Sequence, residues 1–125
     1  MLILCADDEP DIRTILELSL GLEPAIQTEF FESGIALLER ARAGGADAVL
    51  LDAMMPEVDG YETCRRLKAD PATAHLPVVF LTARAQSGER DTALELGAVA
   101  CLTKPFDPLT IAGELLAALE RGGRR

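Results

Sequence analysis

Short apolar runs alternate with longer amphipathic stretches along the whole chain. The apolar runs cover residues 2–6, 26–31, 48–51, 77–81 and 99–103, and Gly, Pro or Asp residues bound them. Apolar runs this short, flanked by turn-forming residues, are typical of buried β-strands. The pattern therefore predicts five strands.

The stretches between these runs place their apolar residues at helical spacing. In the first stretch Ile12, Ile15 and Leu16 follow this spacing, and Pro10 suits the first turn of a helix. Ser33 is a candidate N-cap for the second helix, and glycines follow several of these stretches. Helices are predicted over residues 10–22, 33–43, 59–69, 87–96 and 107–119.

Strict alternation of apolar strands and helices favours a parallel sheet that is covered on both faces. The predicted fold is a doubly wound α/β fold with a five-stranded parallel sheet and five helices. A chain of 125 residues is expected to form one domain. We expect this domain to span residues 1–121, with residues 122–125 as a flexible tail or the start of a linker.

Residues that can carry chemistry stand at the carboxyl ends of four predicted strands. The first strand is followed by Asp7 and Asp8, the third by Asp52, the fourth by Thr82 and the fifth by Lys104. In an open α/β sheet, ligands bind beyond these ends, near the point where the strand order reverses. The second strand has no ionised residue at its end, as expected for an edge strand in the flavodoxin-like order 2-1-3-4-5.

Three converging carboxylates repel one another unless a cation is bound or a pKa is raised. Oxygen ligands without His or Cys suit Mg²⁺ better than zinc. Beside such a cation, an aspartate carboxylate can act as a nucleophile toward phosphorus. The Lys104 ammonium and the Thr82 hydroxyl can then bind the phosphoryl oxygens.

Composition and charge argue against several other classes of protein. The chain has 12 basic and 21 acidic residues and a net charge of −9, so we do not expect it to bind nucleic acid directly. No apolar run approaches the ~20 residues that cross a bilayer, so no membrane span is predicted. The N-terminus lacks the features of a signal peptide. Three cysteines without a Cys-x-x-Cys pair suggest a reducing cytoplasm.

Four segments together resemble the response-regulator receiver domain of two-component signalling. They cover residues 5–10, 50–60, 81–84 and 102–106, and their order and strand-end placement make the resemblance specific. The resemblance extends over nearly the whole chain. It implies a phosphorylation-controlled signalling switch rather than an enzyme. Such a domain accepts a phosphoryl group on Asp52 from a histidine kinase or histidine phosphotransfer protein and assists its own dephosphorylation.

The resemblance also implies roles for individual residues. Asp8 would bind Mg²⁺ directly, Asp7 mainly through water, and Asp52 together with the backbone carbonyl of Met54 would complete the protein ligands. Thr82 and Lys104 would bind the phosphoryl group. The remaining pocket and loop positions are Ala83, which stays small, Arg84, which flanks the group, Pro56 and Gly60, which shape the loop, and Pro105, whose bond to Lys104 is expected to be cis.

One position departs from the family pattern. Cys101 stands three residues before the lysine, where the family usually has Tyr or Phe. An aromatic switch at this position is therefore absent, and output rests on the threonine, nearby loops and the fourth helix, or on another partner surface. A relay or phosphoryl sink is the alternative. Met54 and Arg84 are hypothesised to shield the acyl phosphate from water, the alternative being two solvated loop side chains.

The expected output is a protein contact, either with a downstream target or with a fused output domain. The chain would act as a monomer or as a phosphorylation-dependent dimer. A Mg²⁺-dependent phosphohydrolase with an aspartyl nucleophile is a second hypothesis, but residues 7–10 lack the Asp-x-Asp arrangement of that chemistry. An interaction module with a degenerate site is a third, and the presence of all five polar site residues disfavours it.

Overall fold

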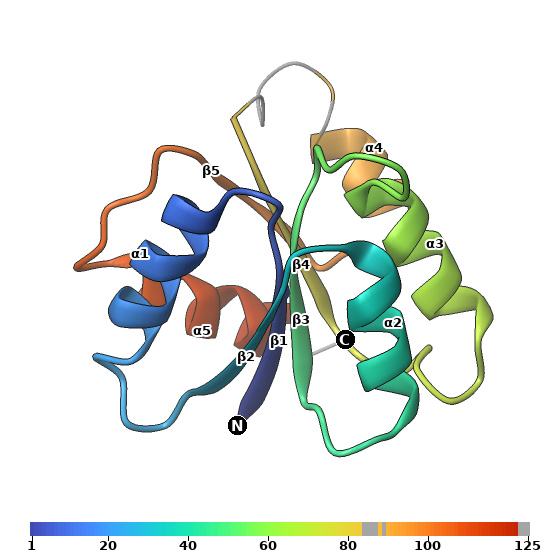
Figure 1. Cartoon of the computed structure of the whole chain (residues 1–125), viewed down its shortest axis with the longest axis horizontal. Coiled ribbons are helices and arrows are strands. Elements are labelled where there is room, and N and C mark those ends of the chain that lie inside the picture. Colours follow the sequence, from blue (N-terminus) through green and yellow to red (C-terminus); the bar gives the residue numbers. More distant parts are fainter. Residues whose placement is uncertain (84–87, 89, 123–125) are drawn as a thin grey trace.

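The computed structural model describes residues 1–83, 88 and 90–122 (Figure 1). Within these residues, strands and helices alternate as predicted. The elements in chain order are β1 (Leu2–Ala6), α1 (Pro10–Leu20), β2 (Gln27–Phe31), α2 (Gly34–Arg42), β3 (Ala48–Asp52), α3 (Gly60–Ala69), β4 (Val78–Thr82), α4 (Arg90–Glu95), β5 (Ala100–Thr103) and α5 (Ile111–Gly122).

The strands form one parallel sheet in the order β2-β1-β3-β4-β5, which confirms the predicted fold class and strand order. Strand β1 pairs with β3 through Ala6 and Leu51, so that Asp7 and Asp52 follow at the same edge of the sheet. Strand β2 lies at one side of the sheet, as its apolar end predicted. The carboxyl ends of β1, β3 and β4 therefore meet at the centre.

Two layers of helices cover the sheet. Helices α1 and α5 lie on one face, and α2, α3 and α4 on the other (Figure 1). Neighbouring strand residues alternate between the two cores, so that Leu50 packs with α1 and α5 while Leu51 packs with α2 and α3. Among the described helices, none is both long and apolar enough to cross a membrane.

Several element ends differ from the predicted ones for local reasons. Helix α5 begins at Ile111 rather than at Asp107, because Asp107 forms a turn first. Its side chain accepts the N–H of Leu109 at 2.9 Å, and its carbonyl accepts the N–H of Thr110 at 3.1 Å. The predicted N-cap of α2 is confirmed, since the Ser33 hydroxyl accepts the N–H of Ala36 at 3.2 Å.

Two predicted boundaries involve residues outside the described part of the chain. The fourth helix is predicted to begin at residue 87, which is not described, and α4 is described from Arg90. Helix α5 continues to Gly122, and residues 123–125 of the predicted tail are likewise outside the described residues.

Candidate functional site

Four carboxyl groups gather at the carboxyl ends of β1 and β3. One oxygen from each of Asp7, Asp8, Glu9 and Asp52 lies within 4.8 Å of the other three. Asp7 and Asp52 are buried, Asp8 is half-buried and Glu9 is exposed. Because β1 and β3 are direct neighbours in the sheet, the fold itself forces the two buried carboxyl groups together.

Glu9 is the member of this group that the sequence did not identify as a ligand. The Asp7 carboxylate accepts the N–H of Glu9 at 2.9 Å, which turns the chain back toward the end of β1. The sequence feature that could have identified Glu9 as a ligand is its position directly after Asp7 and Asp8. Arg13 was also missed, and its Nη1 donates to the backbone carbonyl of Asp7 at 2.7 Å, so that α1 fixes the turn.

Lys104 brings one positive charge into the carboxylate group. Its Nζ lies 2.9 Å from Asp7 Oδ2, 3.3 Å from Asp52 Oδ1 and 3.6 Å from Glu9 Oε1. Burial alone would lower the pKa of Lys104, but hydrogen bonds and attraction from Asp7 and Asp52 outweigh it and raise this pKa above its ordinary value. The lysine is therefore a fixed cation between two buried carboxylates.

Asp52 is 5% exposed, and its environment disfavours the ionised form. Burial, followed by the nearby Asp7 charge, raises the pKa of Asp52 to about 7. Lys104 and the N–H of Met54, which donates to Asp52 Oδ1 at 3.2 Å, act in the opposite direction. A cation that neutralises the group would restore the ionised carboxylate.

The donor set fits a hard divalent cation. Among the described residues, four carboxyl groups gather around the Lys104 ammonium, so their charge exceeds that of the lysine when the acids are ionised. Its ligand atoms are oxygens, with no His or Cys in the group formed by the described residues. Such a set favours Mg²⁺ over zinc. The contact between Met54 and Asp52 is made by the Met54 N–H. The Met54 carbonyl therefore stays a predicted ligand.

Gly60 brings the start of α3 against the backbone of Asp52. A Cβ at residue 60 would lie 2.3 Å from the Asp52 carbonyl oxygen and 2.9 Å from the Cα of Ala53. The N–H of Gly60 donates to the Ala53 carbonyl at 3.1 Å. This close approach requires glycine and supports its predicted role in shaping the loop.

The same loop contains a backbone feature that the sequence did not reveal. Glu57, which follows the exposed Pro56, has a φ of 64° and lies in the left-handed region. A residue other than glycine in this region has an unfavourable backbone conformational energy, which contacts of the surrounding loop must offset.

Thr82 and Lys104 are placed by neighbouring strands. Thr82 is buried at the end of β4, and its carbonyl accepts the N–H of Lys104 at 2.8 Å. The Lys104–Pro105 peptide bond is cis, as predicted. Ala83 follows Thr82 and is exposed, whereas Arg84 lies outside the described residues.

Cys101 and Met54 have opposite environments. Cys101 is buried on β5, directly opposite Phe80 of β4. The Met54 side chain is 64% exposed and lies two residues after Asp52. This exposure is compatible both with shielding of an acyl phosphate on Asp52 and with a solvated loop side chain. All three cysteines are buried, and none forms a disulfide.

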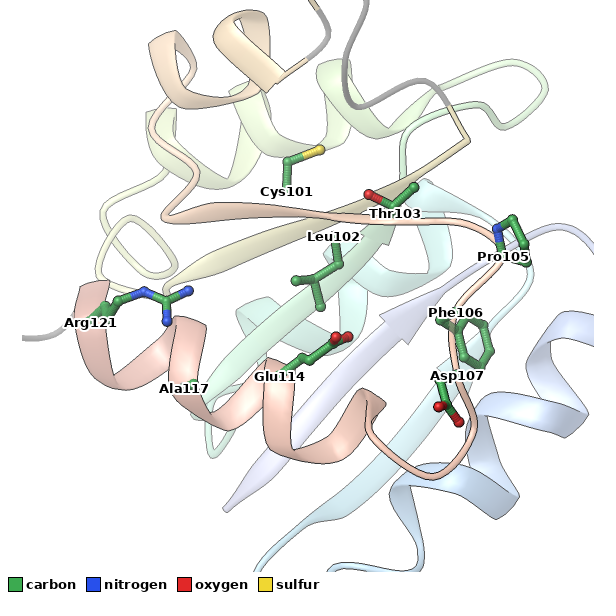
Figure 2. Close-up of a pocket in the computed structure, with 9 residues that line it drawn as sticks. All are labelled: Cys101, Leu102, Thr103, Pro105, Phe106, Asp107, Glu114, Ala117 and Arg121. Carbon is green, nitrogen blue, oxygen red and sulfur yellow. The ribbon is translucent and has the colours of Figure 1, made fainter.

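A pocket of about 420 Å³ lies between β5 and α5 (Figure 2). None of the four carboxyl groups lines it. Ionic chemistry at the strand ends, rather than pocket size, therefore identifies the candidate site.

Comparisons with known proteins agree with this geometry. Residues 3–116 match the family model described as the response regulator receiver domain. Response regulator PleD of Caulobacter vibrioides is 40% identical over 115 residues, which are 87% of this chain and 24% of that protein. Transcriptional regulatory protein CreB of Escherichia coli is 38% identical over 116 residues, which are 92% of this chain and 49% of that protein. The chain spans about a quarter to a half of these relatives.

Solved structures show the same architecture. The receiver domain of a sensor histidine kinase from Pseudomonas aeruginosa, solved with a magnesium ion coordinated in its active site cleft, is 31% identical with a TM-score of 0.81, covering 96% of this chain and 94% of that one. Chemotaxis protein CheY4 of Vibrio cholerae shares the fold with a TM-score of 0.85 at 24% identity, covering 94% and 97%. The family match and these relatives establish that the chain belongs to the response regulator receiver domain family.

Proposed function

We propose that Asp52 accepts a phosphoryl group from a phosphohistidine of a histidine kinase or histidine phosphotransfer protein. The reaction depends on Mg²⁺, and the phosphorylated chain changes its contacts with other proteins. The observation that carries this proposal is the gathering of the Asp7, Asp8 and Asp52 carboxyl groups at the strand ends, with Lys104 held against Asp7 and Asp52. This arrangement combines a carboxylate nucleophile, a cation site and a fixed positive charge.

The two oxygens of Asp52 have different environments. Oδ1 accepts the N–H of Met54 and lies next to Lys104 Nζ. We assign Oδ2, the oxygen outside these two contacts, as the attacking oxygen. The hydrogen bond to Oδ1 orients the carboxylate and leaves Oδ2 to form the new bond.

The phosphoryl transfer needs no covalent chemistry from other residues. The phosphorus–nitrogen bond of the donor breaks as a phosphorus–oxygen bond forms at Asp52, and the imidazole nitrogen leaves with the electron pair of the broken bond and takes a proton from solvent water. Lys104 attracts the phosphoryl oxygens, and the Thr82 hydroxyl lies at the neighbouring strand end to bind them. Hydrolysis of the acyl phosphate returns Asp52 and inorganic phosphate, so the chain is an acceptor that resets itself.

Asp7, Asp8 and Asp52 would hold Mg²⁺, together with the Met54 carbonyl. When bound, the ion neutralises carboxylate and phosphoryl charge. The magnesium ion coordinated in the related Pseudomonas aeruginosa receiver domain supports this assignment. Glu9 adds a further carboxylate at the exposed rim of the site.

We infer that the output is a protein contact, and the greater length of the relatives supports this. CreB and PleD are about two and four times as long as the region that they share with this chain, so a fused output domain or a separate target protein would receive the signal. Three buried cysteines without a disulfide suit a reducing cytoplasm, where we place the reaction.

Intact-protein mass spectrometry tests the proposal. The protein is incubated with Mg²⁺ and a small phosphodonor such as acetyl phosphate, and we expect one adduct of about 80 Da. The adduct is lost in Asp52→Ala and when Mg²⁺ is chelated, but it persists in Asp91→Ala, which removes an exposed acid of α4 outside the site. A folded protein that forms no adduct, or one that keeps it in Asp52→Ala, would refute the proposal.

A further inference from the structure

An aromatic pair lies at the point where the sheet meets the helix that follows Asp52. Leu51, Phe80 and Cys101 face one another in register across β3, β4 and β5. The aromatic side chain of this row is on β4, where Phe80 is fully buried, while β5 contributes the small Cys101. Figure 2 shows Cys101 pointing from β5 to the side of α3 and α4, whereas Leu102 points toward α5.

The ring of Tyr61 on α3 packs against the ring of Phe80 in a tilted arrangement. The two ring centroids are 5.3 Å apart with an angle of 33° between the rings. Tyr61 is half-buried and packs against the hydrophobic cluster that contains Phe80, Cys101 and Ala93 of α4. The pair therefore joins α3 to the part of the core that supports β5 and α4.

Both aromatic residues are also close to the phosphoacceptor site along the chain. Tyr61 directly follows Gly60, whose N–H bonds to Ala53 and whose Cα leaves no room for a side chain against the Asp52 carbonyl. Phe80 precedes Thr82 by two residues on β4, so the two side chains face the same side of the sheet. A shift of the Asp52 loop would therefore reach Tyr61 through Gly60, and a shift of the end of β4 would reach Phe80 through the strand.

We propose that the Tyr61–Phe80 pair couples the phosphorylation state of Asp52 to β5 and α4. This inference rests on the proposed function of Asp52. Close-packed interiors transmit displacements because neighbouring side chains have no free space to absorb them. A second contact extends the path, since the thiol of Cys64 on α3 lies 3.7 Å from the carbonyl oxygen of Leu96 at the end of α4. Tyr61 acts here as a positioning residue rather than as a catalytic one.

The composition provides a direct probe, because Tyr61 is the sole tyrosine and the chain has no tryptophan. Tyrosine fluorescence is recorded before and after addition of acetyl phosphate in the presence of Mg²⁺, with the adduct followed by mass. We expect an emission change that grows with the phosphorylated fraction and is absent in Asp52→Asn. Adduct formation with unchanged emission would overturn the inference while leaving the proposed function intact.

Hydrogen exchange tests whether the pair transmits the change. In the wild type, phosphorylation should alter amide exchange in β5 and α4. We expect Tyr61→Leu to lose this difference while still forming the adduct at the wild-type rate, and Tyr61→Phe, which keeps the aromatic ring, to retain it. An exchange difference in Tyr61→Leu equal to that of the wild type would overturn the inference. Absence of the adduct in the wild type would instead refute the proposed function, and the inference with it.

Discussion

Replacing Asp52 by asparagine should stabilise the metal-free protein at alkaline pH. In the folded chain the pKa of Asp52 is about 7, against an ordinary value of 3.8, so Asp52 keeps its proton to a higher pH than in the unfolded chain. Between these values the folded state binds more protons than the unfolded state, so stability falls as the pH rises from about 4 to about 7. Above about pH 7 this loss of stability is complete. The Asp52→Asn variant has no proton to release at this position and escapes the loss.

The size of the effect follows from the same shift. A change from 3.8 to about 7 corresponds to about 4 kcal/mol, at about 1.4 kcal/mol per pKa unit. Solvent reaches the group through the half-buried Asp8 and the exposed Glu9, and it screens the repulsion. We therefore expect about half of this value, roughly 2 kcal/mol above the window, which is about 8 °C in Tm for a domain of this size.

Urea unfolding followed by circular dichroism measures the difference. Wild type and Asp52→Asn are compared in EDTA at about pH 4.5 and about pH 8, where the predicted gain is small and full respectively. Asp91→Asn is the matched control, because it removes one exposed carboxylate outside the site and should not reproduce the gain. Equal stability of wild type and Asp52→Asn at the higher pH, or an equal gain at both pH values, would refute the electrostatic account.

Other variants test separate parts of the site. Lys104→Met should destabilise the metal-free protein by about 3 kcal/mol at alkaline pH, because the buried Asp7 carboxylate loses its paired cation. Urea unfolding measures this loss, and excess Mg²⁺ should restore the stability of the variant. Gly60→Ala should cost about 3 kcal/mol by the same assay, because its Cβ meets backbone atoms; an unchanged midpoint would contradict this. Met54→Ala combined with Arg84→Ala should shorten the lifetime of the acyl phosphate, measured by mass, and an unchanged decay rate would leave both as solvated loop side chains.

The fold was predictable because its signals are local and repeated. Apolar runs and helical spacing indicated the elements, and polar residues at the ends of β1, β3 and β4 indicated where the site lies. Element ends were less predictable, since the Asp107 turn delays α5 through hydrogen bonds that compete with the helix.

Parts of the site needed three-dimensional information. Asp7, Asp52 and Lys104 were expected to meet, because parallel strands end at one edge. The contact of Glu9 depends on how the turn after β1 closes, which the sequence alone did not determine. The Tyr61–Phe80 ring contact joins α3 to β4, and neither helical nor strand periodicity reports a contact between distant elements.

In the proposed reaction the phosphoryl group forms an acyl phosphate on Asp52. Borohydride reduction of the phosphorylated protein, followed by peptide mass mapping, tests it directly, because reduction of an acyl phosphate converts that aspartate to homoserine. We predict homoserine at residue 52, with a strict requirement for Mg²⁺ during phosphorylation. Homoserine at another aspartate, or phosphate on a residue that resists reduction, would contradict the account.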